Sequence, residues 1–337
     1  MSEYLIYSSI VVASTFLLIP TLGEIFSERS GVLNLGIEGM VIASAAGSFL
    51  IAINTTTTKW SSIGLSPDDN KILGAEPNVF IGLFAGIVIG MIIASIHAIL
   101  TITFNRNQIV SGIGLTFFGT GLSGLFGQNA VGKSNKVNSV DSLKIPILNR
   151  IPFVGDVFFN QNIIVYLSYL LVIAVWFVLF RTKFGIIVRT TGENPAAASN
   201  QGVNVKQVRY ISVIFGGAMA GLGGGYLSIV WQGFWAEGMT SSRGWIVIAL
   251  VIVALWHPIL AVFGSYIFGF FYVYQFRFQA GVNLFGRTVT IPIEFLNMLP
   301  FVATLLFLVI WSVLLSRSKV KRVIGAPSAL TVPFIED

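Results

Sequence analysis

Long apolar runs dominate this chain, and a soluble domain could not bury them all. Of its 337 residues, 55% are hydrophobic and only 10% are charged, whereas soluble domains carry about 25% charged residues. A bilayer core of ~30 Å requires about 20 apolar residues for each spanning helix. The sequence therefore predicts an all-α, polytopic integral membrane protein.

About nine spans are expected, within a range of eight to ten, and they include broken or short helices. One apolar stretch is interrupted by Trp256-His257-Pro258, where a proline ends the preceding helix. We therefore expect two short spans with a tight turn between them. The expected spans are 4–22, 31–53, 79–104, 108–127, 162–180, 209–231, 244–257, 259–278 and 295–316.

Polar connections and basic residues predict the orientation. Residues 1–316 form the transmembrane domain, with extracytoplasmic loops at 55–78 and 128–161. The connection 181–208 and the tail 317–337 are rich in Lys and Arg, which favour the cytoplasmic side. We therefore expect a multi-pass protein of the cell membrane whose C-terminus is cytoplasmic.

Several function classes are disfavoured by composition. Cysteine is absent, so disulfides and thiolate metal sites are excluded. The two histidines, His97 and His257, lie far apart in apolar runs, which favours buried side chains over metal ligands. The net charge of +6 comes from residues that flank the spans. We expect contact with membrane lipid, no nucleic-acid partner, and no cofactor or metal in this chain.

One stretch, GQNAVGKSN at 127–135, matches the phosphate-loop pattern. A true phosphate loop follows a buried strand and opens a helix. Here an apolar, span-length run precedes the pattern, and the residues that follow contain two prolines. We interpret the match as a coincidence, and likewise the glycine pattern at 119–124, which lies inside the same run.

The stretch GEIFSERSGVLNLGIEG at 23–39 places charges and glycines between apolar runs. Charged residues in membrane segments usually face a pathway or a partner, and glycine-broken helices border transporter routes. We assign Asn34 and Glu38 to the translocation path, and for Glu38 a structural pair with another residue is the alternative. The alternative, for Glu24 to Arg29, is a short cytoplasmic loop that leads into an ordinary helix.

Aromatic residues beyond the sixth expected span suggest a second part of the path. Trp231, Phe234 and Trp235 could stack on a ring of a solute near the outer mouth. An interfacial aromatic belt is the alternative.

Small residues recur at four-residue spacing in two spans, at Gly82, Gly86 and Gly90, and at Gly217, Gly221 and Gly225. Such faces predict close packing between helices.

The connection 181–208 contains GENPAAASNQG. Asn194 suits an N-cap, Pro195 the first helical position, and Gly202 a helix end. These residues predict a helix of about two turns, which is marginal alone in water and would be stabilised by a docking partner.

The chain resembles the permease subunits of ABC importers, in the simple-sugar and nucleoside group that is related to branched-chain amino acid and ribose permeases. The similarity extends from about residue 12 to 316. It is carried by GEIFSERSGVLNLGIEGM (23–40), IPILNRIPFVG with FNQN (145–162), GENPAAASNQGVNV (192–205), RYISVIFGGAMAGLGGGYLS (209–228), MTSSRGWIVIALVIVALWHP (239–258) and IEFLNMLPFVATLL (293–306).

The resemblance implies that 192–205 couples the chain to an ATPase subunit through Gly192, Glu193, Asn194, Ala197 and Gly202. It also implies that ATP and magnesium bind to that separate subunit, so this chain is not an enzyme. A second, homologous permease would complete the pore, and an extracytoplasmic binding protein or lipoprotein would deliver the solute. The loop at 128–144 departs from the family pattern.

The expected function is therefore inward passage of a nucleoside or related sugar by alternating access. Nucleoside and sugar remain open as substrates, as do homodimer and heterodimer. The alternative is an ion-coupled secondary transporter in which Glu38 is the coupling carboxylate.

Overall fold

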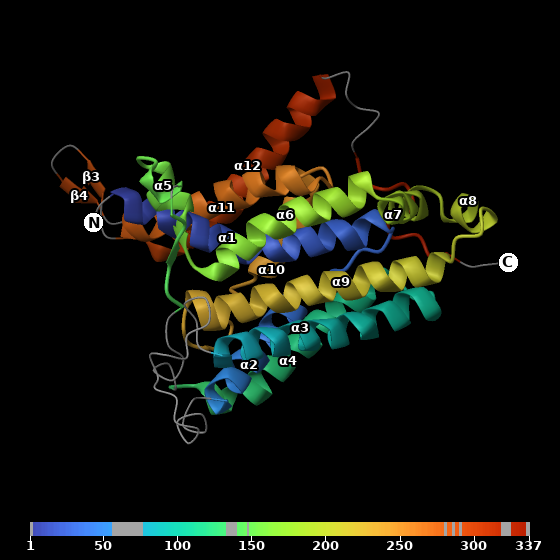
Figure 1. The fold of residues 1–337 in the computed structure, drawn as a ribbon, viewed down its shortest axis with the longest axis horizontal. Coiled ribbons are helices and arrows are strands. Elements are labelled where there is room, and N and C mark those ends of the chain that lie inside the picture. The colour runs from blue at the N-terminus through green and yellow to red at the C-terminus, as the bar shows by residue number, and fades with distance from the viewer. Residues whose placement is uncertain are drawn as a thin grey trace.

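Helices form almost the whole structure, a computed structural model that describes residues 3–55, 77–132, 140–146, 148–279, 282–284, 287–289, 292–317 and 325–334 (Figure 1). The longer helices are α1 (Glu3–Arg29), α2 (Ile37–Asn54), α3 (Pro77–Ala98), α4 (Gln108–Gly127), α6 (Ile163–Arg181), α7 (Lys183–Glu193), α9 (Val205–Gly225), α10 (Arg243–Val253), α11 (Pro258–Gln279) and α12 (Ile293–Arg317). Two π-helical segments, η3 (Ile99–Thr103) and η7 (Tyr226–Trp231), extend α3 and α9.

Short elements connect these helices. They are the 3₁₀ turns η4 (Gln128–Ala130) and η6 (Leu148–Arg150), the helices α5 (Val154–Phe158) and α8 (Pro195–Asn200), and the strands β1 (Leu143–Lys144), β2 (Asn160–Gln161), β3 (Val282–Leu284) and β4 (Arg287–Val289). The strands form two antiparallel pairs, in which Leu143 faces Gln161 and Val282 faces Val289.

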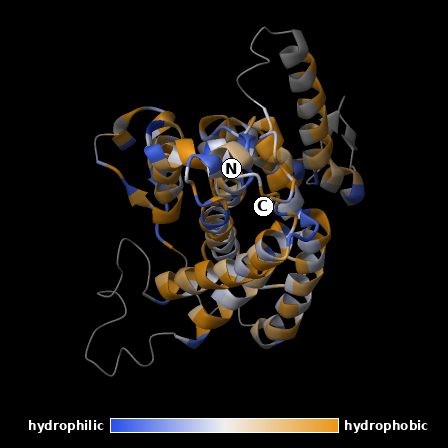
Figure 2. Ribbon diagram, turned by 90° about the vertical axis from the view of Figure 1, so that its right-hand side faces the viewer, coloured by the Kyte–Doolittle hydropathy of each residue, from blue (hydrophilic) through white to orange (hydrophobic). Residues whose placement is uncertain are grey.

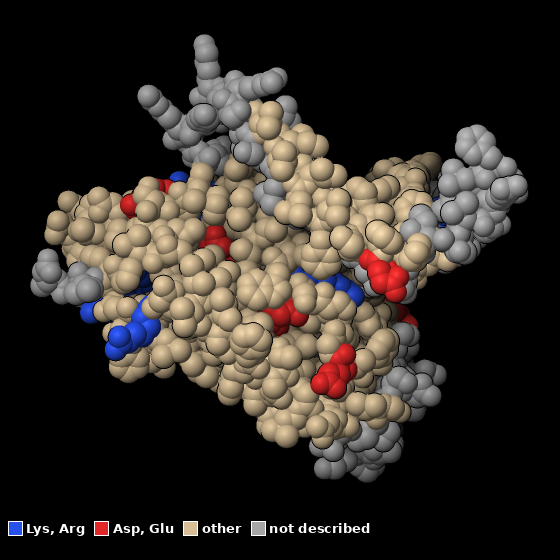
Figure 3. Space-filling model, turned by 180° about the vertical axis from the view of Figure 1, so that it is seen from behind, with Lys and Arg blue, Asp and Glu red and all other residues tan. Residues whose placement is uncertain are grey.

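The described residues contain seven helices that are long and apolar enough to cross a membrane. Two shorter apolar helices, Arg243–Val253 and Glu294–Phe307, complete the set. Each of the nine overlaps one expected span, and the break at Trp256-His257 is confirmed. The chain is therefore an all-α, multi-pass membrane protein. Most of its helices have the colour of hydrophobic residues in Figure 2, and most of the surface shown in Figure 3 is uncharged.

The two termini lie at opposite ends of the bundle (Figure 1). One end, here called the N-terminal end, holds the N-terminus, α5 and the β3–β4 hairpin. The other, here called the α8 end, holds α7, α8 and the C-terminal segment 325–334. This arrangement agrees with an odd number of crossings.

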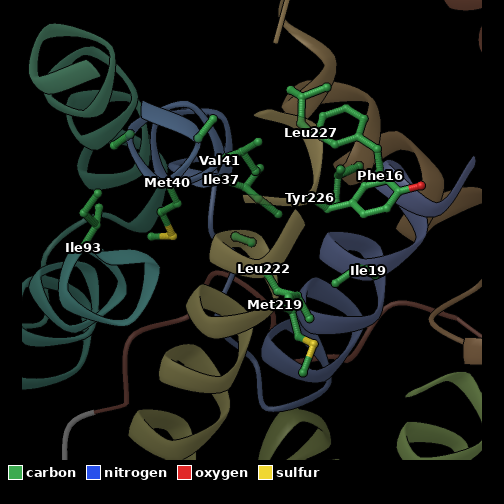
Figure 4. Packing of buried hydrophobic residues seen from close by; sticks show 14 of the residues in the cluster. Phe16, Ile19, Ile37, Met40, Val41, Ile93, Met219, Leu222, Tyr226 and Leu227 are labelled. Atoms are coloured by element: carbon green, nitrogen blue, oxygen red, sulfur yellow. The ribbon is translucent and has the colours of Figure 1, made fainter. Parts of the chain in front are cut away.

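Helix α9 packs against α1, α2 and α3 at the centre of the bundle. Figure 4 shows side chains of α1 and α2 gathered around Met219, Leu222 and Tyr226. A methyl group added at Gly90 would come within 3.0 Å of Gly217 and Gly221. The predicted glycine faces thus bring α3 and α9 into backbone contact, where van der Waals packing stabilises helix pairs in lipid.

Helix starts follow the sequence closely. Five of the described helices begin after a residue whose side chain accepts a hydrogen bond from a backbone N–H of that helix. These residues are Asn107, Asn162, Thr182, Asn194 and Asn204. These side chains satisfy donors that the helix itself leaves unpaired.

Three boundaries differ from the expectation. Helix α1 continues to Arg29 instead of ending near 22, so Glu24 and Glu28 are helical rather than part of a loop. The connection 181–208 begins with α7, an amphipathic helix that buries Val188 against the bundle. The expected loop 128–161 also contains short elements. In each case, contacts with other parts of the bundle stabilise the observed helix or turn, and the apolar pattern of the sequence does not reveal those contacts.

Candidate functional site

The site is built around the non-helical segment 30–36, which interrupts the bundle between α1 and α2. Gly31 has φ +92°, a conformation that side chains other than glycine rarely adopt. Residues Asn34 and Gly36 are buried. Irregular backbone inside a membrane protein requires polar partners, because no water is present to satisfy it.

Side chains from neighbouring helices provide those partners. The N–H of Leu33 donates to Gln108 Oε1 (2.8 Å), and its carbonyl lies 3.0 Å from His97 Nε2. Thr116 donates to the Leu35 carbonyl (3.0 Å), and Arg209 Nε to the Ser30 carbonyl (3.2 Å). His97 is thus a buried structural residue, as the sequence indicated.

Asn34 closes a turn within this segment. Its side-chain oxygen accepts from the Gly36 N–H (3.1 Å), its own N–H donates to Glu24 Oε1 (3.0 Å), and its amide nitrogen contacts Met40 Sδ (3.3 Å). These local partners and 1% exposure give Asn34 a structural role in the break.

Glu38 lies in the first turn of α2 and meets the start of α10. Its two carboxylate oxygens accept hydrogen bonds from Thr240 Oγ1 (2.5 Å) and from the Gly244 N–H (2.6 Å). A helix N-terminus has unpaired N–H groups and a partial positive charge, so it favours a carboxylate. The preceding residues Ser241 and Ser242 have φ +48° and +62°, so the chain turns sharply into α10 at this point.

Arg243 lies beside this carboxylate within a cage of aromatic rings. Its guanidinium carbon is 4.6 Å from the ring centre of Tyr272, 5.8 Å from that of Trp231 and 6.0 Å from that of Phe16. Guanidinium groups are attracted to such ring faces. Arg243 Nη1 is buried and has no hydrogen-bond partner among the described residues.

The other end of α10 is anchored to the end of α1. Trp256 Nε1 donates to Glu28 Oε2 (2.5 Å), while Arg29 Nε donates to the Trp256 carbonyl (3.1 Å). Leu255 and Trp256 have φ +51° and +55°. Helix α10 is therefore a half-length helix with a sharp turn and a buried carboxylate at each end.

The three aromatic residues predicted to border the path occupy different places. Trp231 packs against Phe16 and Tyr272 and lines a cavity of about 620 Å³ between α1, η7 and α11. Phe234 is 39% exposed. Trp235 is buried against Gly127 at the end of α4.

The predicted coupling segment lies at the α8 end. Asn194 Oδ1 accepts from the Ala197 N–H (2.9 Å) and caps α8, and Gly202 follows it with φ +81°. The predicted helix and both of its end signals are confirmed. Ala197 is exposed, whereas Gly192 is buried against the backbone of Arg29 and Gly31.

A segment of the C-terminal tail, 325–334, packs against this coupling segment. The Glu193 carboxylate accepts from Ser328 Oγ (2.9 Å) and Ser328 N–H (3.2 Å), and the Ala329 N–H donates to the Gly192 carbonyl (2.9 Å). Arg209 Nη1 donates to the Val332 carbonyl (3.3 Å). The sequence indicated only a basic tail here.

Nothing described supports a phosphate site at 127–135. Gly127 ends helix α4 and a 3₁₀ turn follows it, where a phosphate loop requires a preceding strand. Lys133 and Ser134 lie outside the described residues. The glycine pattern at 119–124 lies within α4, and Gly119 packs on the Gly39 backbone. Among the described residues, no group of three His, Cys, Asp or Glu could hold a metal ion.

Sequence reasoning missed Arg243, Gly244, Tyr272 and Trp256 as parts of this arrangement. The sequence did contain a signal for Arg243, because this charged residue directly precedes an apolar run, as Glu38 does. The contacts of Tyr272 and Trp256 depend on tertiary packing alone.

Residues 6–311 match the profile of a protein family described as the permease component of branched-chain amino acid transport systems. The guanosine ABC transporter permease protein NupQ of Bacillus subtilis is 32% identical, over 97% of each chain. The nucleoside ABC transporter permease protein NupC of Lactococcus lactis is 30% identical, over 91% of this chain and 92% of the relative. TsgC13 of Haloferax volcanii, provisionally named a glucose ABC transporter permease, is 39% identical over 80% of this chain and 76% of the relative. No solved structure matches the chain significantly.

Proposed function

The chain belongs to the family of permease components of branched-chain amino acid transport systems, and we propose that it forms half of the pore of an ATP-driven importer for nucleosides or related sugars. Its similarity to NupQ, NupC and TsgC13, which are named as guanosine, nucleoside and glucose permeases, supports this substrate range. Transport proceeds by alternating access, in which the two openings of the pore are never open together.

The single observation that carries the proposal is the exposed, capped helix α8. A helix of six residues is too short to be stable alone in water, yet here Asn194 caps it and Ala197 faces outward. We assign Gly192, Glu193, Asn194, Ala197 and Gly202 to coupling with a separate ATPase subunit. ATP and magnesium bind to that subunit.

The contacts described above suggest how coupling reaches the pore. Gly192 touches the backbone of Arg29, which binds the turn at Trp256 at one end of α10. The opposite end of α10 binds Glu38. A displacement of α8 therefore reaches the pore-lining region through α10 as a rigid body, the kind of switch that packed helices allow.

The remaining partners follow from the same proposal. A second, homologous permease completes the pore, and an extracytoplasmic binding protein or lipoprotein delivers the solute. Exposed Arg181, Lys183 and Lys206 lie at the α8 end, which supports a cytoplasmic position for that end and for the C-terminus in the cell membrane.

An ion-coupled secondary transporter remains the second candidate, because the bundle holds more buried carboxylates than the sequence suggested. Glu24 Oε2 and Glu28 Oε1 are buried without hydrogen-bond partners among the described residues. The two candidates separate cleanly in uptake assays. Uptake by an ABC importer requires a functional ATPase partner and survives a protonophore in ATP-loaded vesicles, whereas ion-coupled uptake collapses.

The coupling assignment is tested by placing a bulky residue on α8. We expect Ala197→Trp to reduce co-purification of the ATPase subunit and to abolish uptake, while the chain remains in the membrane. Val131→Trp is the matched control, because Val131 is 62% exposed at the N-terminal end. Unchanged association and uptake in Ala197→Trp would rule out a docking role for α8.

A further inference from the structure

One of the described cavities differs from the others because an amide and a charged side chain, Gln232 and Arg277, belong to its lining. The cavity of about 400 Å³ between α2, α3 and α4 has only apolar lining residues, including Ile92 and Phe118. The cavity of about 620 Å³ between α1, η7 and α11 is lined by aromatic rings and by polar side chains, among them Trp231, Gln232 and Tyr272. Small-molecule sites characteristically combine apolar walls with a few polar groups, in volumes of about 300–1,000 Å³.

The cavity lies at the N-terminal end of the bundle, opposite α8. Its lining comes from Ile6 and Ser9 near the start of α1, from the end of η7, and from the last turns of α11 at Phe276 and Arg277. A solute delivered on the extracytoplasmic side would reach it first.

The aromatic wall of this cavity covers an unsatisfied donor. Trp231 and Tyr272 lie edge to face, with ring centres 5.4 Å apart, and both rings also contact Arg243. Arg243 is 9% exposed, and its Nη1 has no hydrogen-bond partner among the described residues. A buried donor of this kind is costly unless a ligand or water accepts from it.

We propose that this cavity holds a neutral nucleoside, with its base stacked on Trp231 or Tyr272 and its hydroxyls near Gln232. The inference rests on the proposed function and extends it to a site. Aromatic faces can stack on any base, because every base has a flat π-surface, and the Gln232 side-chain amide offers both a donor and an acceptor to ribose hydroxyls.

The position of Arg243 connects this cavity to helix α10. Arg243 is the first residue of α10, and Glu38 accepts from the next residue. A solute that stacks on Trp231 or Tyr272 therefore touches rings that contact Arg243, at the start of the half-length helix whose far end is joined to the coupling segment. A bound solute and the coupling segment are thus both connected to helix α10, one at each of its ends.

The first test labels the site directly. Membranes that contain the complete transporter are irradiated with 8-azidoguanosine, and the labelled peptides are mapped. We expect label in 226–243 and 258–279, and we expect excess guanosine to remove it and an equal concentration of glucose to remove less. Label confined to other peptides, such as 115–127, would overturn the site, and equal competition by glucose would overturn the choice of a nucleoside.

The second test measures guanosine uptake by the complete transporter in a host that lacks nucleoside uptake. We expect Trp231→Ala to raise the half-saturating concentration about tenfold or more, and Trp231→Phe, which retains a ring, to stay within about threefold of wild type. Phe118→Ala, in the apolar cavity, is the control and should match wild type.

The outcomes distinguish the site from the function. If the wild-type transporter carries neither nucleosides nor sugars, the proposed function fails. If it carries guanosine while Trp231→Ala and Gln232→Ala both match wild type, the function stands and the site is rejected. Membrane abundance and thermal unfolding in detergent identify variants that misfold, and for those the labelling of the wild-type protein decides.

Discussion

The N–H of Gly244 donates a 2.6 Å hydrogen bond to the carboxylate of Glu38, across 206 positions in the chain. The bond joins the start of α2 to the start of α10, so neither helix can slide past the other without breaking it. A methyl group at 244 would lie within 3.0 Å of the Glu38 backbone and carboxylate. The start of α10 therefore depends on glycine at 244 and on a carboxylate at 38.

Substitution at this contact should impair transport. We expect Glu38→Gln to reduce uptake at least tenfold. Thr240 and Gly244 each donate to one carboxylate oxygen of Glu38, whereas an amide has a single oxygen, so one of these two donors would face an N–H group. Gly244→Ala should have a similar effect through steric overlap. Gly114→Ala, where a methyl would meet nothing within 4 Å, is the control. Wild-type uptake by Glu38→Gln would contradict a role for this contact.

The close approach of α3 and α9 should be sensitive to a single methyl group. Gly90→Ala should lower the free energy of unfolding by about 1–3 kcal/mol, because the added group meets Gly217 and Gly221. Gly121→Ala, with open space around it, should change it by less than about 1 kcal/mol. Denaturant titration in detergent compares the two variants. Equal stability would show that α3 and α9 do not pack this closely.

The turn between α10 and α11 should depend on the indole of Trp256. Trp256→Phe retains the ring but removes the donor to Glu28, and loss of a buried hydrogen bond costs about 1–3 kcal/mol. In a double-mutant cycle with Glu28→Ala, which removes the acceptor, the two effects should be non-additive. Additive effects measured by thermal unfolding would mean that the two side chains do not interact.

The C-terminal segment should order the coupling region. Ser328→Ala removes the hydroxyl that donates to Glu193, and a hydrogen bond worth about 1 kcal/mol corresponds to about a fivefold change in local opening. Hydrogen exchange of 192–202 should accelerate accordingly. Ser9→Ala, near the start of α1, should leave exchange in 192–202 unchanged. Unaltered exchange in Ser328→Ala would show that the segment does not stabilise α8.

His257 should make the protein sensitive to acid. Burial lowers the pKa of His257 below its ordinary value of 6.5, and the positive charge of Arg29 lowers it further. The unfolded chain therefore gains a proton at this position before the folded chain does, so the stability present above about pH 6.5 is lost as the pH falls. Between pH 8 and pH 5, the melting temperature of His257→Gln should fall less than that of wild type. An identical fall would contradict the shift.

Local sequence signals predicted the helices well. The nine apolar runs, the break at Trp256-His257 and the cap at Asn194 depend on residues that are near one another in the chain. Hydrophobic length, proline geometry and N-capping act over a few residues, so a single sequence contains the information. The glycine faces of α3 and α9 were predicted for the same reason, since their four-residue spacing is visible in each run alone.

The site itself was predicted only in part. Glu38 stood out because a carboxylate in an apolar run is costly without a partner, but the sequence could not say that the partner is the Gly244 amide. Trp231 and Trp235 looked alike in sequence, yet one lines a cavity and the other covers Gly127. The alternatives of an aromatic belt and a stacking surface could not be separated without the fold.

By itself, the sequence determined that this chain crosses a membrane, where its spans lie, and which short helix is exposed between them. Only the tertiary structure decided which residue meets which: Glu38 with Gly244, Glu28 with Trp256, and Glu193 with Ser328. The physical reason is the range of the forces involved. Burial and capping are set by near neighbours, whereas a hydrogen bond inside a bundle requires two groups within about 3 Å, and only the packing of whole helices brings them there.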